Sequence, residues 1–253
     1  MLAPPACGLK PRLYERLGED PAALWRSFRD SGQSVRPGRP VKLSASLYYF
    51  GKRRKNRTTI SLWGRQGEVM RLDVRAGVGS LVSAWLERPD YFLAYFPGEK
   101  TAYASRTPLA GQAALGLPFP FTLLDLAAVA GGRLDALLPQ AYDRAEETVN
   151  GVRYFFEDGA VSSLSLDKQG RLQAVQGREP WPYELELGDY PEEDDGFARK
   201  LSLRMDEASA LLRVKSLEHR VEPWPEGAVG LDLPEGTRIM WIDESALEAE
   251  PEF

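Results

Sequence analysis

The side chains that most often carry catalysis are scarce in this sequence. It contains one histidine, His219, and one cysteine, Cys7, and these lie far apart in a chain of 253 residues. A Cys-His or Ser-His nucleophile needs its imidazole within hydrogen-bond reach, so neither arrangement is expected. Charged residues flank His219 on both sides, which favours the exposed end of a strand. The sequence therefore argues against an enzyme.

Metal-binding and phosphate-binding patterns are not found either. No set of cysteines and histidines has the spacing of a zinc site. Carboxylates gather between Asp189 and Asp195, but they lack the glycine-punctuated alternation of a calcium loop, and a solvated hairpin is expected. The glycines fall in predicted turns rather than between a strand and a helix, unlike those of a phosphate loop. We expect no metal and no cofactor.

Positive charge is concentrated on one predicted hairpin tip, from Lys52 to Arg57, although the chain as a whole carries a net charge of −5. Near an anionic bilayer each such charge contributes about 1 kcal/mol, enough to orient a peripheral protein. A plain solvated turn is the alternative interpretation. The acidic overall balance argues against a nucleic-acid partner.

An uncharged, apolar stretch runs from Thr107 to Leu124. Its length approaches that of a membrane span. However, Pro108, Pro118 and Pro120 interrupt any continuous helix, and the stretch lacks the alternation of a strand. We expect it to fold back over a sheet as a loop and short helices, where it either caps the core or contacts a ligand.

The only cysteine lies near the start of the chain. Residues 1–7 are too few to contain the basic and apolar regions of a secretory signal. The small residue Ala6 directly precedes Cys7, as in a clipped lipoprotein signal, although two prolines upstream fit a lipobox poorly. Cys7 is thus either a lipidation site or an incidental cysteine in a flexible terminus. A single cysteine permits no internal disulfide and does not distinguish the cytosol from the periplasm.

Sequence periodicity predicts a mainly β protein with a short leading helix. Asp20 is suited to cap this helix, Pro21 to begin it and Gly32 to end it. Two groups of strands follow, separated by the apolar stretch and by two short helices at 126–129 and 133–138. The first group comprises Val41–Tyr49, Thr58–Gly64, Glu68–Arg75, Gly79–Glu87, Tyr91–Phe96 and Thr101–Arg106. The second comprises Gly151–Phe156, Ala160–Leu166, Arg171–Gln176, Tyr183–Leu187, Ala198–Met205, Leu211–Leu217 and Thr237–Ile242.

A single antiparallel sheet of about eleven strands curls strongly, so a barrel or half-barrel is expected. No linker or sharp change of composition divides it. We therefore expect one domain over residues 20–242, a flexible segment at 1–19 and an acidic tail at 243–253. Aromatic residues cluster on the first group of strands, where they serve either ordinary core packing or a cavity for an apolar ligand.

The order of these elements resembles the LolA/LolB family of lipoprotein carriers. It consists of a leading helix, a six-strand meander, a proline-containing apolar segment with short helices, a second meander and a closing Pro-Glu-Gly-Thr strand. The segment Leu115-Gly116-Leu117-Pro118 looks like the one that follows the sixth strand in the LolB group of outer-membrane receptors. The resemblance covers about Trp25 to Ile242. It implies an unclosed, strongly curved antiparallel β-barrel with a helical lid and an apolar interior that receives acyl chains.

The resemblance also implies a function and its site residues. The chain is expected to bind lipoprotein acyl chains without catalysis, to accept them from a periplasmic LolA-like carrier and to deliver them to the inner leaflet of the outer membrane. Lipid on Cys7 would anchor it on the periplasmic face, and Val78 lies where the family has an exposed, membrane-contacting leucine. The candidate acyl-chain residues are Leu47, Tyr49, Trp63, Leu72, Trp85, Leu93, Tyr95, Phe119, Phe121, Leu123 and Leu124.

Two other functions are compatible with the same sequence. The first is an anchored lipoprotein that binds another lipid or a glycolipid, because a fold does not determine its ligand. The second is a structural module with a solidly packed barrel whose surface binds a protein partner.

Overall fold

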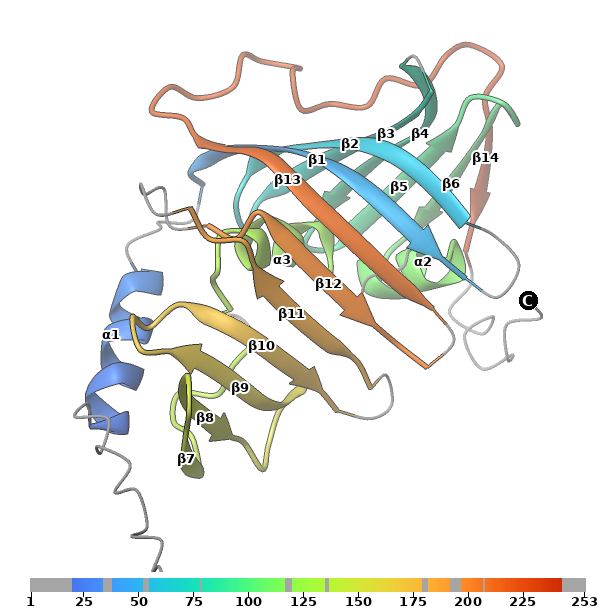
Figure 1. Ribbon diagram of the computed structural model, residues 1–253. Coiled ribbons are helices and arrows are strands. Elements are labelled where there is room, and N and C mark those ends of the chain that lie inside the picture. The colour runs from blue at the N-terminus through green and yellow to red at the C-terminus, as the bar shows by residue number, and fades with distance from the viewer. Residues whose placement is uncertain are drawn as a thin grey trace, which may run out of the picture.

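The computed structural model describes residues 20–33, 38–51, 55–77, 79–116, 120–134, 137–178, 182–191, 197–206 and 208–242. This part of the chain forms three helices, α1 (Pro21–Gln33), α2 (Pro108–Ala114) and α3 (Leu123–Ala130), and one sheet of fourteen strands (Figure 1). The predicted class, a mainly β protein with a single curved, unclosed sheet and short helices, is confirmed. The total exceeds the eleven or so strands expected for the sheet, and thirteen of the fourteen overlap the strand ranges named from the sequence.

The strands divide into two meanders and a final edge strand. The first meander consists of β1 (Pro40–Phe50), β2 (Lys55–Arg65), β3 (Val69–Ala76), β4 (Ser80–Arg88), β5 (Tyr91–Phe96) and β6 (Thr101–Ser105). The second consists of β7 (Arg144–Thr148), β8 (Gly151–Phe155), β9 (Val161–Asp167), β10 (Leu172–Gly177), β11 (Glu184–Gly188), β12 (Lys200–Arg204) and β13 (Ser209–His219). The edge strand is β14 (Arg238–Trp241).

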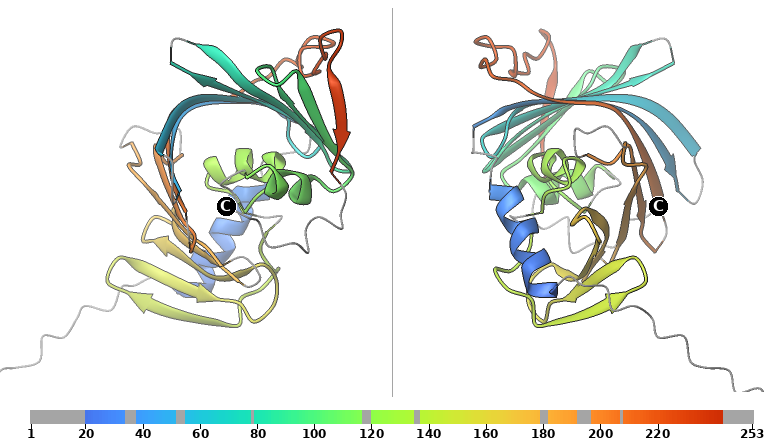
Figure 2. Two further views of the ribbon diagram at one scale, coloured as in Figure 1. Left: turned by 90° about the vertical axis from the view of Figure 1, so that its right-hand side faces the viewer. Right: turned by 60° about the vertical axis from the view of Figure 1, so that its left-hand side comes forward.

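The two meanders meet in the middle of the sheet, where β1 pairs antiparallel with β13. From β1 the first meander runs outward to β6. The chain then passes through α2 and α3 to the opposite edge at β7, and the second meander returns to β13 (Figure 1). Residues far apart in sequence are thereby joined in one continuous curved surface. Figure 2 shows α2 and α3 beneath the arch of this surface, with α1 beside the second meander.

A C-terminal strap, residues 220–237, crosses the convex side of the sheet from β13 to β14 (Figure 1). Hydrogen bonds from two indole groups hold the strap against the sheet. The Trp63 Nε1–H donates to the Ala228 carbonyl at 3.1 Å, and the Trp224 Nε1–H donates to the Gly64 carbonyl at 2.9 Å. Beyond the strap, β14 pairs with β6 in parallel, in contrast to the antiparallel pairing of the other strands. The strap thus gives the convex face a cover of its own.

Helix α1 begins as its sequence predicts. The Asp20 Oδ1 atom accepts a hydrogen bond from the Ala22 amide at 3.0 Å, which satisfies one free donor of the first turn. The Tyr154 hydroxyl donates to the Pro21 carbonyl at 2.8 Å and ties the helix to β8. On the buried face of α1, Trp25 is surrounded by aromatic rings at centroid distances of 5.1 to 5.9 Å. These rings belong to Phe28, Tyr142, Tyr154 and Phe156.

Two local predictions differ from the structure. The edge strand β7 was not expected, because its residues are charged and mostly exposed rather than alternating. Helix α3 begins at Leu123, earlier than expected. Of the short helix expected at 133–138, residues 135 and 136 lie outside the described residues, and the amides of Leu137 and Leu138 donate to the Leu134 carbonyl. Residues 52–54 of the basic tip and 192–196 of the acidic loop lie outside the described residues.

In the part of the chain that the structure describes, no helix is long and apolar enough to cross a membrane.

Candidate functional site

The sheet buries apolar side chains on both of its faces. The interior core lies on the concave side, between the sheet and helices α1 and α3, and it combines residues of both meanders. The convex core is smaller and lies beneath the strap, where Trp224, Val229, Leu231 and Leu233 cover the other face of β2 to β6. The two cores are separated by the sheet itself.

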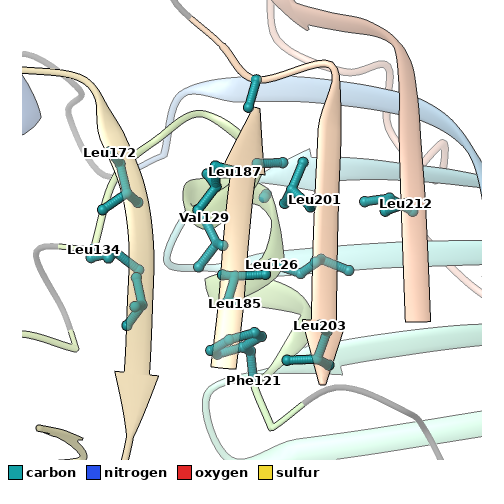
Figure 3. Close-up of a cluster of buried hydrophobic side chains, with 14 of the residues drawn as sticks. Phe121, Leu126, Val129, Leu134, Leu172, Leu185, Leu187, Leu201, Leu203 and Leu212 are labelled. Carbon is teal, nitrogen blue, oxygen red and sulfur yellow. The ribbon is translucent and has the colours of Figure 1, made fainter. Parts of the chain in front are cut away.

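Several of the predicted acyl-chain residues lie together in the interior core. Five are buried there, and Leu124 is half-buried against them. The five are Leu47, Leu72, Trp85, Phe121 and Leu123. Figure 3 shows how the apolar stretch and α3 contribute, with Phe121, Leu126 and Val129 facing the leucines of β11 and β12. Contact of these residues with an acyl chain stays a prediction.

Three other predicted residues do not lie in the interior core. Trp63, Leu93 and Tyr95 pack in or against the convex core, beneath the strap. Strand alternation explains this, because Leu93 and Tyr95 flank Ala94, which pairs with the inward-facing Trp85. The expectation that all the strand residues share one lining is corrected here, since the predicted set mixes the two faces.

The remaining predicted residues are less well placed. Tyr49 is half-buried, two residues beyond Leu47 on the same strand and therefore on the same face. Phe119, Val78 and Cys7 lie outside the described residues.

Helices α2 and α3 cover the concave side of the first meander, and we call residues 108–116 and 120–130 the lid. The helix α2 lies unusually close to the sheet at Gly111. A Cβ atom at this position would lie 2.7 Å from Phe92 Cδ1 and 2.8 Å from Ser105 Cβ, both closer than side chains pack. Glycine therefore allows α2 to rest directly on β5 and β6.

The start of α3 is fixed by a capping box. The Thr122 Oγ1 atom accepts from the Asp125 amide at 3.1 Å, and Asp125 Oδ2 accepts from the Thr122 amide at 3.2 Å. The sequence Thr-x-x-Asp before an apolar run is a recognisable helix start. It accounts for the early beginning of α3.

A buried carboxylate, that of Glu87 on β4, joins the lid to the sheet. It has no exposed surface and accepts hydrogen bonds from the Leu123 amide at 2.7 Å and the Leu124 amide at 3.3 Å. The Gln112 side-chain amide of α2 donates to it as well. Burial raises the pKa of Glu87 to about 7, more than these hydrogen bonds lower it, and Asp125 adds to the rise. One carboxylate thus binds both lid helices.

Sequence reasoning did not identify Glu87 as a site residue. Glu87 follows Trp85 by two positions on an alternating strand, so both side chains face the same, inward side. The sequence signal that could have identified Glu87 is a charged residue at an inward-facing position of an alternating strand.

The single histidine, His219, ends β13 as expected, but it is half-buried rather than solvated. Burial lowers its pKa, and the positive charges of Arg39 and Arg133 lower it further. Among the described residues, no three side chains of His, Cys, Asp or Glu are grouped to hold a metal ion.

Solved structures with similar folds come from several bacteria. A domain described as an outer membrane lipoprotein-sorting protein, from Vibrio parahaemolyticus, superposes with a TM-score of 0.57 at 12% identity, over 81% of this chain and 95% of its own. A LolA superfamily protein from Nitrosomonas europaea gives 0.54 at 10% identity, over 78% and 94%. A DUF1329 family protein from Desulfovibrio piger gives 0.56 at 8%, over 83% and 100%.

No protein-family model matches the sequence, and no curated protein sequence matches it. At such low sequence identities the structural matches show the fold alone. The chain therefore has the open, curved β-sheet fold seen in LolA superfamily and lipoprotein-sorting domains.

Proposed function

We propose that the protein binds the acyl chains of a lipoprotein between the concave face of the sheet and the lid, and passes them to the outer membrane. The observation that carries the proposal is the apolar interior core, which lies under a two-helix lid in a fold similar to that of lipoprotein-sorting domains. Its residues on α3 and on β11 to β13 are leucine, valine and alanine (Figure 3). The reaction is binding and release, with no bond made or broken.

The energetics of an acyl chain favour such a shelter. Each methylene group removed from water contributes about 0.8 kcal/mol, so one long chain represents on the order of 10 kcal/mol. A lipoprotein cannot cross an aqueous compartment with this surface exposed. Burial against leucine side chains restores the loss, and transfer into a bilayer of equal apolarity lets the chain leave again.

In the structure, side chains of the lid occupy the concave side. Phe121, Leu123 and Leu126 are each at most 3% exposed. An acyl chain therefore has to move the lid away from the sheet and lie between the two, in contact with both. The lid consists of helices of seven and eight residues joined through a proline-containing segment. It can therefore move away from the sheet without breaking the strand pairing.

The remaining parts of the proposal follow the resemblance of the sequence to LolB-like receptors. Lipid on Cys7 anchors the protein to the periplasmic face of the outer membrane. A periplasmic LolA-like carrier supplies the cargo, and Val78 contacts the inner leaflet during delivery.

Uptake of an acyl probe tests the binding step. A fluorescent monoacylglycerol added to the detergent-free protein is expected to bind saturably, with one probe per chain, and unlabelled lipid should displace it. A protein that folds normally but takes up no probe at any ratio would contradict the proposal.

Truncation of Phe121 to alanine is expected to weaken acyl-probe binding about tenfold, the equivalent of about 1.4 kcal/mol of lost contact. The same change should lower the free energy of unfolding by less than the usual cost for a packed phenylalanine, about 3 to 5 kcal/mol. The loss of unfolding free energy is limited because Phe121 belongs to the lid. When the lid opens before the rest of the fold unfolds, weaker lid contacts do not affect the stability of the remaining fold.

Phe156 provides the matched control for this prediction. It is also 3% exposed, but it packs against Trp25 of α1 rather than within the lid. Phe156→Ala should show the full loss in urea unfolding and an unchanged probe affinity. Equal destabilisation by the two substitutions, together with equal affinities, would show that Phe121 has no role beyond packing.

Lipidation of Cys7 is expected in the native host. Mass spectrometry of the protein extracted from membranes should find a diacylglycerol group on this residue, and Cys7→Ser should move the protein into the soluble fraction. An unmodified cysteine in the membrane-extracted protein would refute the anchoring.

A further inference from the structure

The hydrogen bonds of Glu87 connect three segments that are distant in sequence. Its carboxylate on β4 receives Gln112 from α2 and the first two amides of α3, those of Leu123 and Leu124. The amides at a helix start have no partner within the helix, so a carboxylate in this position satisfies them. Without Glu87, these donors would be buried against apolar side chains.

Among the described residues around Glu87, no positive charge contributes to its pKa. Across the sheet it pairs with Met70 on β3 and with Phe92 on β5. From the lid, Gln112 and Thr122 face it as neutral polar groups, and Asp125 adds a negative charge. An ionised carboxylate in this place is stabilised by its donors but is cut off from water, and the loss of hydration is the larger effect.

We propose that Glu87 is a latch, a positioning residue that holds the lid closed while it carries a proton and weakens closure when the proton is lost. The inference rests on the proposed function only for the ligand that binds beneath the lid. The contacts that define the latch all lie within the chain. Opening exposes the carboxylate to water, so the open state favours the ionised form. Uptake of acyl chains is therefore coupled to pH.

The direction and the range of the pH effect follow from the two states of Glu87. In the closed lid its pKa is about 7, whereas an exposed glutamate has 4.5. Between these values the closed state holds a proton that the open state releases. The lid is therefore most firmly closed below about pH 4.5, and closure weakens as pH rises to about 7, above which no further change is expected.

Hydrogen exchange of individual amides, followed by NMR on the full chain, measures this opening without any lipid. Dividing the exchange rate of the Leu123 and Leu124 amides by their intrinsic rates gives the opening equilibrium at each pH. It should rise roughly fortyfold between pH 5 and pH 7 and then level off. Amides of β9, a strand that pairs with β8 and β10, should show no such rise. An opening equilibrium of the α3 amides that does not change with pH would overturn the proposal.

Two variants separate the latch from an ordinary structural contact. Glu87→Gln cannot ionise, so its opening equilibrium should be the same at pH 5 and pH 7. Asp73→Asn is the matched control, because Asp73 is a buried carboxylate that is paired instead with Arg71 and Arg75. This variant should keep the rise of the parent. A rise that persists in Glu87→Gln would assign the pH dependence to another group and overturn the latch.

A second measurement on the unmodified chain guards against a Glu87→Gln variant that does not fold. The carboxyl carbon of Glu87, observed by NMR with labelled glutamate, should titrate over the same pH range in which the lid opens. Separate ranges for the two transitions would refute the coupling.

Acyl uptake distinguishes the latch from the proposed function. A fluorescent monoacylglycerol does not titrate in this range, so its uptake rate should rise with pH in parallel with opening. A lid that opens with pH while no probe binds would retain the latch and refute acyl binding. Probe uptake without pH-dependent opening would support acyl binding and refute the latch.

Discussion

Replacement of Trp25 by alanine is expected to lower the free energy of unfolding by about 3 to 5 kcal/mol, the usual cost of truncating a large core aromatic. The indole is 6% exposed and contacts four aromatic rings, three of them outside α1. Its loss leaves a cavity that these rings cannot fill. Urea unfolding followed by circular dichroism measures the change.

Trp241→Ala is the matched control. Trp241 lies on β14 and is 60% exposed, so its truncation should cost less than about 1 kcal/mol. Equal losses for the two tryptophans would contradict the assignment of α1 as a closing element of the interior core.

Gly111→Leu is expected to displace α2 from the sheet and to hold the lid partly open. The new side chain would meet Phe92 and Ser105 at distances shorter than van der Waals contact, and overpacking of this kind costs about 1 to 3 kcal/mol. Because each 1.4 kcal/mol is a factor of ten, uptake of the acyl probe should become roughly tenfold faster. Stopped-flow fluorescence measures this rate.

Ala114→Leu is the matched control, because it adds the same side chain at the end of α2, where Ala114 is exposed. Its uptake rate should equal that of the parent. Faster uptake in both variants, or in neither, would show that the contact of α2 with β5 and β6 does not control access.

The parts of the fold that follow from local signals could be predicted from the sequence. Asp20 and Pro21 predicted the start of α1, and the strands β8 to β13 lie within two residues of the bounds that the periodicity predicted. Such features depend on neighbouring residues alone. The apolar, proline-broken segment was also expected over the sheet, and its described residues form part of the lid.

The arrangement of the sheet depends on contacts that no local signal encodes. Strand alternation gives the period of a pattern but not which side faces inward when both faces are buried. Trp63 and Tyr95 were therefore grouped with Leu72, although the strap covers a second apolar core on their side. The parallel pairing of β14 with β6 could not be predicted either, because the strap determines where β14 lies.

The role of Glu87 shows a different limit of sequence reasoning. Its position on an alternating strand marks it as inward-facing, but its partners come from α2 and from the start of α3. Whether a buried carboxylate is satisfied depends on such distant groups. Only the folded arrangement brings Gln112 and Leu123 to one atom of this side chain.

The central claim, that acyl chains bind between the concave face and the lid, is tested most directly by photolabelling. A photoactivatable monoacylglycerol is bound to the detergent-free protein and irradiated, and the labelled residues are identified by mass spectrometry, with excess unlabelled lipid as the competitor. The label is expected on the interior core, at Phe121, Leu126 and the leucines of β11 and β12. Label confined to the strap and the convex core around Leu93, or label that unlabelled lipid does not displace, would contradict the account.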